Sequence, residues 1–332
     1  MVKRFLSAAW KALSGREGRA YCTCFDSLYL AQGIAMLRSL RLYDRLAEIH
    51  VLAFDDLCAD ILGEVFAGTI RVVRLSTLHV RFPSLPGIRD GRSRWACYAT
   101  HKPALARFIL ENRPRPRSVT FIDADTWFFA DPAPLYEEIA GASIAVSPHR
   151  FSAATAHLAV YGEYNAGCIY WRSGETARQC AADWERECLE WCDEQPTADG
   201  LFMNQGYLNR WPGRYSGVHV IRHPGVNLAP WNIDGHRVAR GGGGITVDGL
   251  PLIFYHFSGI TRDPERRWWY LFYPHEGAQF EFIHEAIYGP YLLAIETESD
   301  LLRKTYGVDG IGSIRSITIG PDNMQLRAAA WK

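Results

Sequence analysis

The chain has 332 residues, enough for one large domain with an appendage or for two modest domains. Hydrophobic residues make up 48% of the sequence and charged residues 22%, the balance of a globular protein with a sizeable core. Lys plus Arg and Asp plus Glu both number 36, so the formal net charge is zero. This balance argues against a general nucleic-acid binder.

Neither a spanning helix nor a signal peptide is expected. The sequence contains no run of about 18 apolar residues, and the basic residues 1–18 lack an uninterrupted apolar core and a cleavage site. Residues 1–18 form an amphipathic helical stripe, and "RRWWYLFY" (266–273) combines arginines with aromatic residues. We expect residues 1–18 and 263–304 either to contact the inner face of the membrane, or to pack on the main domain or form a homodimer contact.

The eight cysteines are scattered, and the sequence has no CxxC pair of the zinc-ribbon type. Cys22 and Cys24 would share one strand face, and Cys188 and Cys192 one helix face. Reduced structural thiols in a cytoplasmic protein are therefore expected.

Short β-rich apolar runs alternate with longer amphipathic segments in the first half of the chain. The expected strands are 19–25, 48–55 and 69–77, and the expected helices are 27–43 and 56–66. This alternation predicts an α/β fold with βαβ units around a mixed, mostly parallel sheet.

A loop rich in Arg, Gly and Pro covers residues 81–94. Arg94 could reach a phosphate, but we expect the arginines of 89–94 to be solvated. The next helix is expected to begin at Thr100 as its cap, with Pro103 in the first turn. Beyond residue 140 the expected elements are strands at 143–148, 166–172 and 217–222, a helix at 174–192 and a hairpin turning at Asp248-Gly249. The glycines at 241–244 lack the Lys-Ser/Thr ending of a phosphate loop and are interpreted as a flexible loop.

The stretch "SVTFIDADTWFFADP" (118–132) carries two acids inside an apolar strand pattern. Side chains alternate along a strand, so Asp123 and Asp125 would point to the same side. Two carboxylates in apolar surroundings stay ionised only with a cation or several donors nearby. A divalent cation that bridges to phosphate oxygens at the carboxyl end of a strand fits this arrangement. The alternative is that both acids cap a turn or pair with arginines.

Two enzyme classes carry an Asp-x-Asp after a hydrophobic strand. Phosphatases of the haloacid-dehalogenase type usually have Gly and then Thr after the second Asp, on the first strand of the fold. This chain has Thr126 and Trp127 there, past residue 120, so the phosphatase is kept as an alternative.

Several stretches, in the same order, resemble glycosyltransferases of the GT-A fold, especially the retaining group that includes glycogenin and bacterial lipopolysaccharide galactosyltransferases. They are "CFDSLYLAQGIAMLRSL", "HKPALARFIL", "FIDADTWFF", "YNAGCIYW", "FMNQGYLNRW" and "YHFSG". The resemblance covers roughly residues 20–260. It implies a GT-A domain over residues 19–262, and we expect a basic amphipathic segment (1–18) before it and a helical C-terminal extension (263–332) after it.

The resemblance also implies roles for individual residues. The residues that it places on a nucleotide-sugar donor are Asp26, Tyr29, Lys102, Asp123, Ala124 and Gly167. The metal ligands that it implies are Asp123, Asp125 and His256, and the residues beside the reacting sugar are Asn165, Ala166, Asn204 and Gln205. Each has a plainer alternative: a core histidine for His256, a surface lysine for Lys102 and turn or cap residues for the amides.

Two departures from that group stand out. The usual Asp-Gln pair is Asn204-Gln205, which removes a carboxylate, and the Lys-Pro-Trp after the last motif is replaced by "ITRDPERRWW". Tryptophans and tyrosines at 207–231 could stack on a sugar, although most are expected in the core.

The resemblance therefore implies a metal-dependent glycosyltransferase with a nucleotide-sugar donor, a UDP-sugar, and a saccharide or glycoconjugate acceptor. A cluster of two carboxylates and an imidazole suits Mn²⁺, or else Mg²⁺. Transfer is expected to retain the anomeric configuration, because neither amide of the Asn204-Gln205 pair can act as a base. A non-catalytic sugar- or nucleotide-binding protein on the same fold is the remaining alternative.

Overall fold

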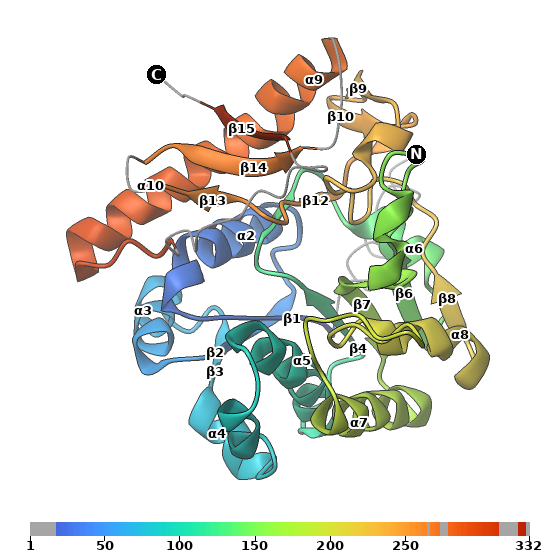
Figure 1. Ribbon diagram of the computed structural model, residues 1–332. Helices are drawn as coiled ribbons and strands as arrows, with labels where there is room; N and C mark the ends of the chain where they lie inside the picture. The colour runs from blue at the N-terminus through green and yellow to red at the C-terminus, as the bar shows by residue number, and fades with distance from the viewer. Residues whose placement is uncertain (1–17, 264–265, 273–277, 312–324, 330–332) are drawn as a thin grey trace, which may run out of the picture.

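The computed structural model describes residues 18–263, 266–272, 278–311 and 325–329, and a mixed seven-stranded sheet forms its centre (Figure 1). The strand order is β3-β2-β1-β4-β7-β6-β8. The strands of this sheet are β1 (Arg19–Phe25), β2 (Glu48–Ala53), β3 (Arg71–Arg74), β4 (Ser118–Ile122), β6 (Ile144–Pro148), β7 (Tyr164–Arg172) and β8 (Val218–Val220).

The sheet is parallel on one side and mixed on the other. Strands β3, β2, β1 and β4 run parallel, whereas β7 lies antiparallel between β4 and β6. The chain moves outward from β1 to β3 and then returns to β4 on the opposite side of β1. This reversal creates a topological switch point, where ligands bind beyond the carboxyl ends of the strands.

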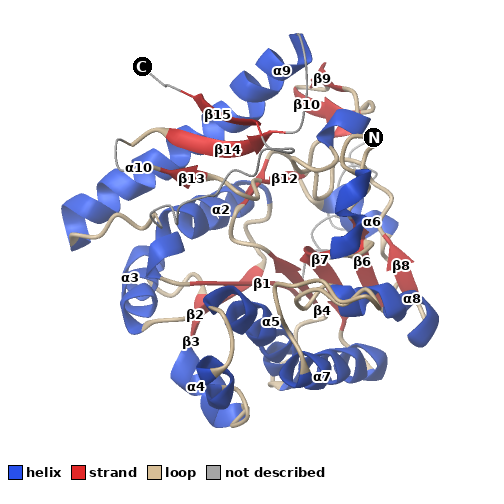
Figure 2. Ribbon diagram, in the orientation of Figure 1, coloured by secondary structure: helices blue, strands red, loops and turns tan. Residues whose placement is uncertain are grey.

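Helices cover both faces of the sheet (Figure 2). One core holds α2 (Leu30–Tyr43), α3 (Asp56–Phe66) and α6 (Ala133–Glu138), and the other holds α4 (Leu75–Arg81), α5 (Arg94–Glu111), α7 (Glu175–Glu190) and α8 (Trp211–Arg214). Alternation along β1 feeds both cores, because Tyr21 and Phe25 pack in the first while Ala20 and Cys22 pack in the second. The predicted α/β architecture is thus confirmed.

Two expected boundaries were wrong. The strand expected over 69–77 ends at Arg74, and residues from Leu75 form α4. Helix α5 begins at Arg94 rather than after Thr100, because Ser93 Oγ accepts the Ala96 N–H at 3.2 Å and caps it. Pro103 therefore lies well inside this helix, not in its first turn.

The hairpin turn at Asp248-Gly249 is confirmed between β10 (Gly244–Val247) and β11 (Leu250–Pro251), with φ of 51° and 84° at the two turn residues. The preceding glycines are not a flexible loop. Gly242 and Gly243, with φ of 58° and 86°, form a second tight turn that joins β9 (Val238–Gly241) to β10.

The C-terminal part forms a layer over α2. It contains α9 (Ala278–Ile283), a π turn (His284–Tyr288), α10 (Gly289–Tyr306), and a small sheet of β13 (Thr261–Arg262), β14 (Trp268–Phe272) and β15 (Gln325–Ala329). Helix α10 packs against α2 (Figure 1). The extension is therefore helical as expected, with an added strand layer.

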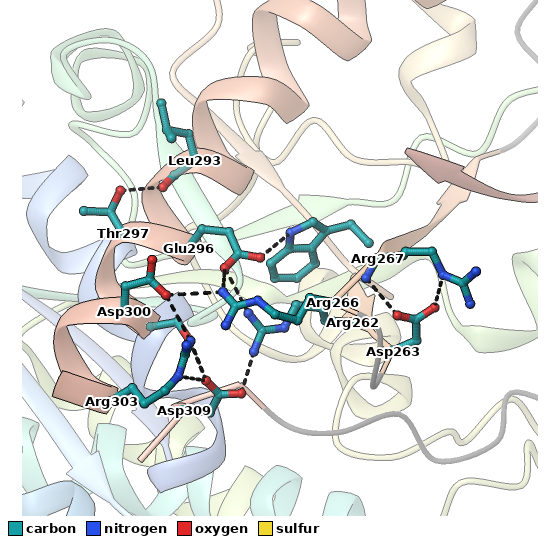
Figure 3. Close-up of polar contacts among 12 residues, drawn as sticks. Arg262, Asp263, Arg266, Arg267, Leu293, Glu296, Thr297, Asp300, Arg303 and Asp309 are labelled. Carbon is teal, nitrogen blue, oxygen red and sulfur yellow. Dashed lines mark hydrogen bonds and ion pairs between the residues drawn. The ribbon is translucent and has the colours of Figure 1, made fainter. Parts of the chain in front are cut away.

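Ion pairs join the small sheet to α10 (Figure 3). The buried Arg262 guanidinium lies 3.0 Å from Glu296 and 2.5 Å from Asp309, and Arg266 also contacts Glu296. Trp268 is buried, and its indole N–H donates to Glu296 at 3.0 Å. Parts of the "RRWWYLFY" segment are thus committed to contacts within the chain.

No helix among the described residues is long and apolar enough to cross a membrane. Residues 1–17, to which the amphipathic stripe belongs, lie outside the described residues, as does residue 273. All eight cysteines are free thiols, and all except the partly exposed Cys24 are buried.

Candidate active site

A cavity of about 640 Å³ lies beyond the carboxyl ends of β1 and β4. Ten of the residues singled out in the sequence line it: Tyr29, Lys102, Asp123, Ala124, Asp125, Asn165, Ala166, Asn204, Gln205 and His256. The structure thus brings together residues that are more than 200 positions apart in the sequence.

The two acids occupy a turn rather than a strand. Strand β4 ends at Ile122, and β5 (Thr126–Phe128) begins after Asp125. The Asp123 N–H donates to the Gly167 carbonyl at 3.1 Å, and the Phe257 N–H donates to the Asp125 carbonyl at 2.7 Å. Strand alternation is therefore not what aligns the carboxylates; the turn is held from both sides, and both acids stay partly exposed to the cavity.

His256 reaches this turn through a strand pair. Strand β12 (Phe254–His256) runs antiparallel to β5 and places His256 opposite Thr126. The His256 Nε2 atom lies 3.1 Å from Asp125 Oδ1 and 3.9 Å from Asp123 Oδ2. One ligand atom from each of the three residues falls within 4.8 Å of the others.

The pKa values of this cluster reflect mutual stabilisation. Burial alone would lower the pKa of His256, but the carboxylates of Asp125 and Asp123 raise it above its usual value. Burial would raise the pKa of Asp125, yet the neighbouring His256 holds it below its usual range. Two carboxylates and one imidazole at this spacing fit Mn²⁺ or Mg²⁺. Such a metal would compete with a proton for the Nε2 atom of His256.

Lys102 supplies a fixed positive charge on the other side of Asp123. Its Nζ lies 2.5 Å from Asp123 Oδ1. Burial opposes the charge, but Asp123 raises the pKa of Lys102 above its usual value. The lysine comes from the middle of α5 and not from the first turn of a helix, where the expected cap at Thr100 would have placed it. Beside it, burial raises the pKa of the Cys24 thiol to about 12, which keeps that thiol neutral.

Asp26 and Tyr29 lie in the turn that leads from β1 into α2. Asp26 Oδ1 accepts the Leu28 N–H at 3.1 Å, and its second oxygen is bound by Arg94 and the Tyr98 hydroxyl. The expectation that Arg94 is a solvated loop residue was therefore wrong, because Arg94 forms an ion pair with Asp26. The i, i+4 spacing of Arg94 and Tyr98 would have revealed this pair had the helix been started at residue 94.

The expected turn at Asn165, Ala166 and Gly167 was wrong: these residues belong to strand β7, and Gly167 lies against the acid cluster. A Cβ on Gly167 would lie 2.6 Å from Asn165 Oδ1, 2.7 Å from His256 Cε1 and 2.8 Å from Asp123 Oδ2. Such distances are shorter than any real Cβ contact, so only glycine permits these groups to converge. The Gly167 N–H donates to Asn165 Oδ1 at 2.9 Å and orients that amide.

The two amides of the Asn204-Gln205 pair face different ways. Gln205 Nε2 donates to the Tyr161 carbonyl at 2.9 Å, which turns its own carbonyl oxygen toward Asn165 and Ala166. Asn204 Nδ2 instead donates to the Ala99 carbonyl of α5 at 2.9 Å. Gln205 is therefore the member of the pair whose side-chain oxygen faces Asn165 and Ala166.

An aromatic wall closes the cavity beyond Gln205, and most of it was not singled out in the sequence. We define it as His149, Phe151, Tyr161, Phe202 and Trp231. The rings of His149 and Phe151 stack at 4.6 Å, and those of Tyr161 and Phe202 lie 4.7 Å apart. Burial lowers the pKa of His149 to about 4, so the imidazole is neutral near pH 7. Of the aromatic residues at 207–231 considered for sugar stacking, Trp231 lies in this wall, whereas Tyr207 and Trp211 pack in a core.

No family model matches the chain. It is, however, 31% identical over 248 residues to the uncharacterized protein YfnF of Bacillus subtilis, an alignment that covers 72% of the chain and 81% of YfnF. The chain belongs to the family of YfnF. A second uncharacterized protein of the same organism, YfnD, is 27% identical over 294 residues, which cover 86% of the chain and 91% of YfnD.

Among solved structures, this YfnF relative is similar to the galactosyltransferase LgtC, crystallised with donor and acceptor sugar analogues. The TM-score is 0.50 at 15% identity, over 72% of the chain and 87% of LgtC. An active-site mutant of LgtC gives the same TM-score at 14% identity, over 73% of the chain and 88% of that protein. The GT-A fold that the sequence motifs predicted is thereby confirmed.

Proposed function

We propose that the protein is a metal-dependent glycosyltransferase that transfers a sugar from a nucleotide-sugar donor, a UDP-sugar, to a saccharide or glycoconjugate acceptor. The observation that carries this proposal is the convergence of Asp123, Asp125 and His256 within 4.8 Å at the switch point of a GT-A fold. The similarity to LgtC, which was solved with donor and acceptor sugar analogues, supports the substrate class.

The leaving group of this reaction is a diphosphate that departs with added negative charge. Asp123, Asp125 and His256 would hold Mn²⁺ or Mg²⁺, whose charge stabilises the departing diphosphate. Lys102, with its pKa raised beside Asp123, adds a permanent positive charge at the same place. Because these charges lie in a partly buried cavity, they act on the diphosphate with little screening by water.

The nucleoside has an aromatic site at the start of α2. Tyr29 and Trp95 meet edge to face, with ring centroids 6.0 Å apart, and both line the cavity. The Trp95 side chain is 40% exposed, which leaves its ring available to stack on a planar ligand. Asp26, held by Arg94 and Tyr98, fixes the turn that carries Tyr29.

The donor sugar would lie between Lys102 and the aromatic wall, next to Gln205. Gln205 presents a neutral carbonyl oxygen there. Among the described residues, the carboxylates that line the cavity are Asp123, Asp125 and Glu194. Glu194 accepts a hydrogen bond from Ser93 at the beginning of α5, so it is not positioned as a base beside Gln205. We therefore propose retention of the anomeric configuration.

The acceptor would enter along the aromatic wall. The side chains of the aromatic wall carry no formal charge near pH 7, since the imidazole of His149 is neutral there. Apolar walls with a few oriented polar groups favour neutral ligands with a hydrophobic face, which pyranose rings possess. The wall therefore supports a saccharide or glycoconjugate acceptor.

Cytoplasmic location and contact with the inner face of the membrane are a further part of the proposal. The free cysteines agree with a reducing compartment. Sedimentation with anionic liposomes at moderate salt tests the membrane contact, and absence of co-sedimentation would contradict it. For the segment at residues 266–273, the burial of Trp268 and Tyr270 instead favours packing on the main domain.

Donor hydrolysis tests the function directly. A thermal-shift screen of nucleotide sugars with Mn²⁺ identifies the donor, because selective binding stabilises the folded state. Hydrolysis of that donor should then require Mn²⁺ and be lost in Asp125→Ala. Release of inorganic phosphate from simple phosphomonoesters would instead indicate a phosphatase, and binding without turnover a non-catalytic protein.

A further inference from the structure

We propose that Asn227 is a positioning residue that holds His256 in the form that binds a metal and joins the metal cluster to Asn165 and Gln205. This inference rests on the proposed function. Asn227 belongs to no motif noted in the sequence, lines no part of the cavity and would not be found from spacing.

Asn227 bridges the two halves of the site. Its side chain is fully buried, and its Oδ1 atom lies 3.2 Å from His256 Nδ1. At the other end, its Nδ2 atom donates to Asn165 Oδ1 at 3.1 Å and to Ser147 Oγ at 3.2 Å. One amide thus touches both the imidazole of the cluster and the residue beside the sugar.

The direction of these hydrogen bonds is fixed by a main-chain group. The Gly167 N–H can only donate, so the atom of Asn165 that faces it at 2.9 Å must be the carbonyl oxygen. Asn227 must then present its NH₂ group to that same oxygen and its own carbonyl to His256. A carbonyl can only accept, so His256 carries a proton on Nδ1.

That proton leaves Nε2 as the nitrogen available to a metal. Nε2 is the atom that faces Asp125 and Asp123, at 3.1 Å and 3.9 Å. Partners of the second ring nitrogen set the tautomer and orientation of a histidine ligand, and their loss typically weakens metal binding about 10- to 100-fold. Asn227 takes this role for His256.

The hydrogen bonds from Asn227 to Asn165 continue to Gln205, beside which the donor sugar is proposed to lie. Asn165 Nδ2 faces His149 Nε2 at 3.2 Å and Gln205 Oε1 at 3.4 Å. Gln205 is fixed in turn by the Tyr161 carbonyl. The polarity set at Gly167 therefore also determines which side of Asn165 faces Gln205, so disturbing Asn227 reaches both parts of the site.

The backbone around Asn227 is built for this position. Its φ is 57°, in the left-handed region that Asn and Gly adopt more readily than other residues. The next residue, Leu228, bridges to β12, and its carbonyl accepts the His256 N–H at 2.7 Å. The loop is thus tied to the strand that carries the imidazole.

Three variants separate the two arms of Asn227. Asn227→Gly keeps the left-handed backbone and removes both arms. Asn227→Asp keeps an acceptor for His256 Nδ1 but turns a carboxylate oxygen against Asn165 Oδ1. Asn232→Ala is the matched control: it removes another fully buried amide of the same loop, whose Nδ2 donates to the His149 carbonyl at 2.7 Å and which does not contact His256.

The decisive measurement is Mn²⁺ binding to the full chain without nucleotide. The electron paramagnetic resonance signal of free Mn²⁺ reports how much of the metal is bound. Asn227→Gly should raise the Mn²⁺ dissociation constant about 10- to 100-fold. Asn227→Asp should leave it within about threefold while lowering kcat for donor hydrolysis about tenfold or more, since it preserves the second ring-nitrogen partner alone. Asn232→Ala should bind Mn²⁺ like the wild type. Thermal unfolding confirms that each variant is folded at the assay temperature.

Equal Mn²⁺ affinity in the wild type and Asn227→Gly would overturn the role of Asn227 and leave the proposed function standing. Weakened binding in Asn232→Ala to the same degree would also overturn it, because any buried amide of the loop would then suffice. Failure of the wild type itself to bind Mn²⁺ would overturn the metal-dependent function together with this inference.

Discussion

The side-chain amide of Asn204 donates a hydrogen bond of 2.9 Å to the main-chain carbonyl of Ala99. In an uninterrupted helix this carbonyl would receive the N–H of the residue four positions later, but that residue is Pro103, which has none. Asn204 therefore completes the hydrogen bonding of α5 from outside. An ionised Asp at position 204 could not make this hydrogen bond, because it has no proton to donate.

Removing this amide should destabilise the protein. Asn204→Ala leaves the Ala99 carbonyl buried without a partner, so we expect the free energy of unfolding to fall by about 1–3 kcal/mol. In a Pro103→Ala background the new N–H bonds to Ala99, and the cost of Asn204→Ala should be about 1 kcal/mol smaller. Urea unfolding of the four proteins in this cycle measures the difference. Strictly additive effects would show that Asn204 does not compensate for the proline.

The ion pair between His256 and Asp125 should make the stability of the metal-free protein depend on pH. The folded pKa of His256 is raised, so its contribution is complete below about pH 6.5 and is lost as the pH rises through the folded value. The folded pKa of Asp125 is lowered, so its contribution is complete above about pH 4 and is lost as the pH falls through the folded value.

Asp125→Asn should therefore lower the free energy of unfolding most between about pH 4 and 6.5. Above the raised pKa of His256 the pair is no longer ionic, and the difference from the wild type should shrink. Urea unfolding in EDTA at pH 5.5 and pH 9 compares the two conditions. The same difference at both pH values would contradict the assignment of the ion pair.

Metal binding should show the opposite dependence on pH. A metal takes the Nε2 lone pair of His256, which is protonated in the metal-free ion pair, so binding must release that proton. We expect the Mn²⁺ affinity to rise with pH until it passes the raised pKa of His256, and then to level off. Calorimetric titration at pH 6 in two buffers of different ionisation enthalpy should give about one proton released per Mn²⁺. Release of no proton would exclude His256 as a ligand.

The exposed ring of Trp95 should contribute to nucleotide affinity and not to metal affinity. Trp95→Ala removes the ring of α5 that meets Tyr29 in the cavity and leaves the acid cluster unaltered. An aromatic pair contributes about 0.5–1.5 kcal/mol beyond its buried area, so the dissociation constant of the nucleotide should rise at least about 2- to 10-fold. Calorimetry with nucleotide and with Mn²⁺ alone separates the two effects. An unchanged nucleotide affinity would place the base elsewhere.

The sequence predicted those parts of the site that local patterns determine. Strand β1 and the acid pair each follow from a hydrophobic run that ends in a polar motif. The start of α5 was misplaced because both Ser93 and Thr100 are plausible caps; in the structure Ser93 caps the helix, whereas the Thr100 hydroxyl donates to the Ala96 carbonyl inside it. The roles of Asn204 and Asn227 depend wholly on tertiary partners, Ala99 and His256, so neither residue carries a signal that spacing could reveal.

Gln205 is expected to act in the transition state of a retaining transfer. Its carbonyl oxygen, turned toward the sugar side because its amide nitrogen bonds to Tyr161, can stabilise positive charge on the donor ring but cannot form a lasting covalent intermediate. We expect attack from the face of the departing diphosphate, which takes the acceptor's proton.

Gln205→Ala should lower kcat about tenfold or more and leave the donor KM nearly unchanged, the signature of a contact made mainly in the transition state. Asn204→Ala provides the matched control, since its amide points to α5, and its donor turnover should fall much less at a temperature where it is folded. NMR of the first-formed product then decides the stereochemistry: a retained anomeric centre agrees with the neutral amide at this position, whereas an inverted one would contradict the proposed retention and call for a base other than Gln205.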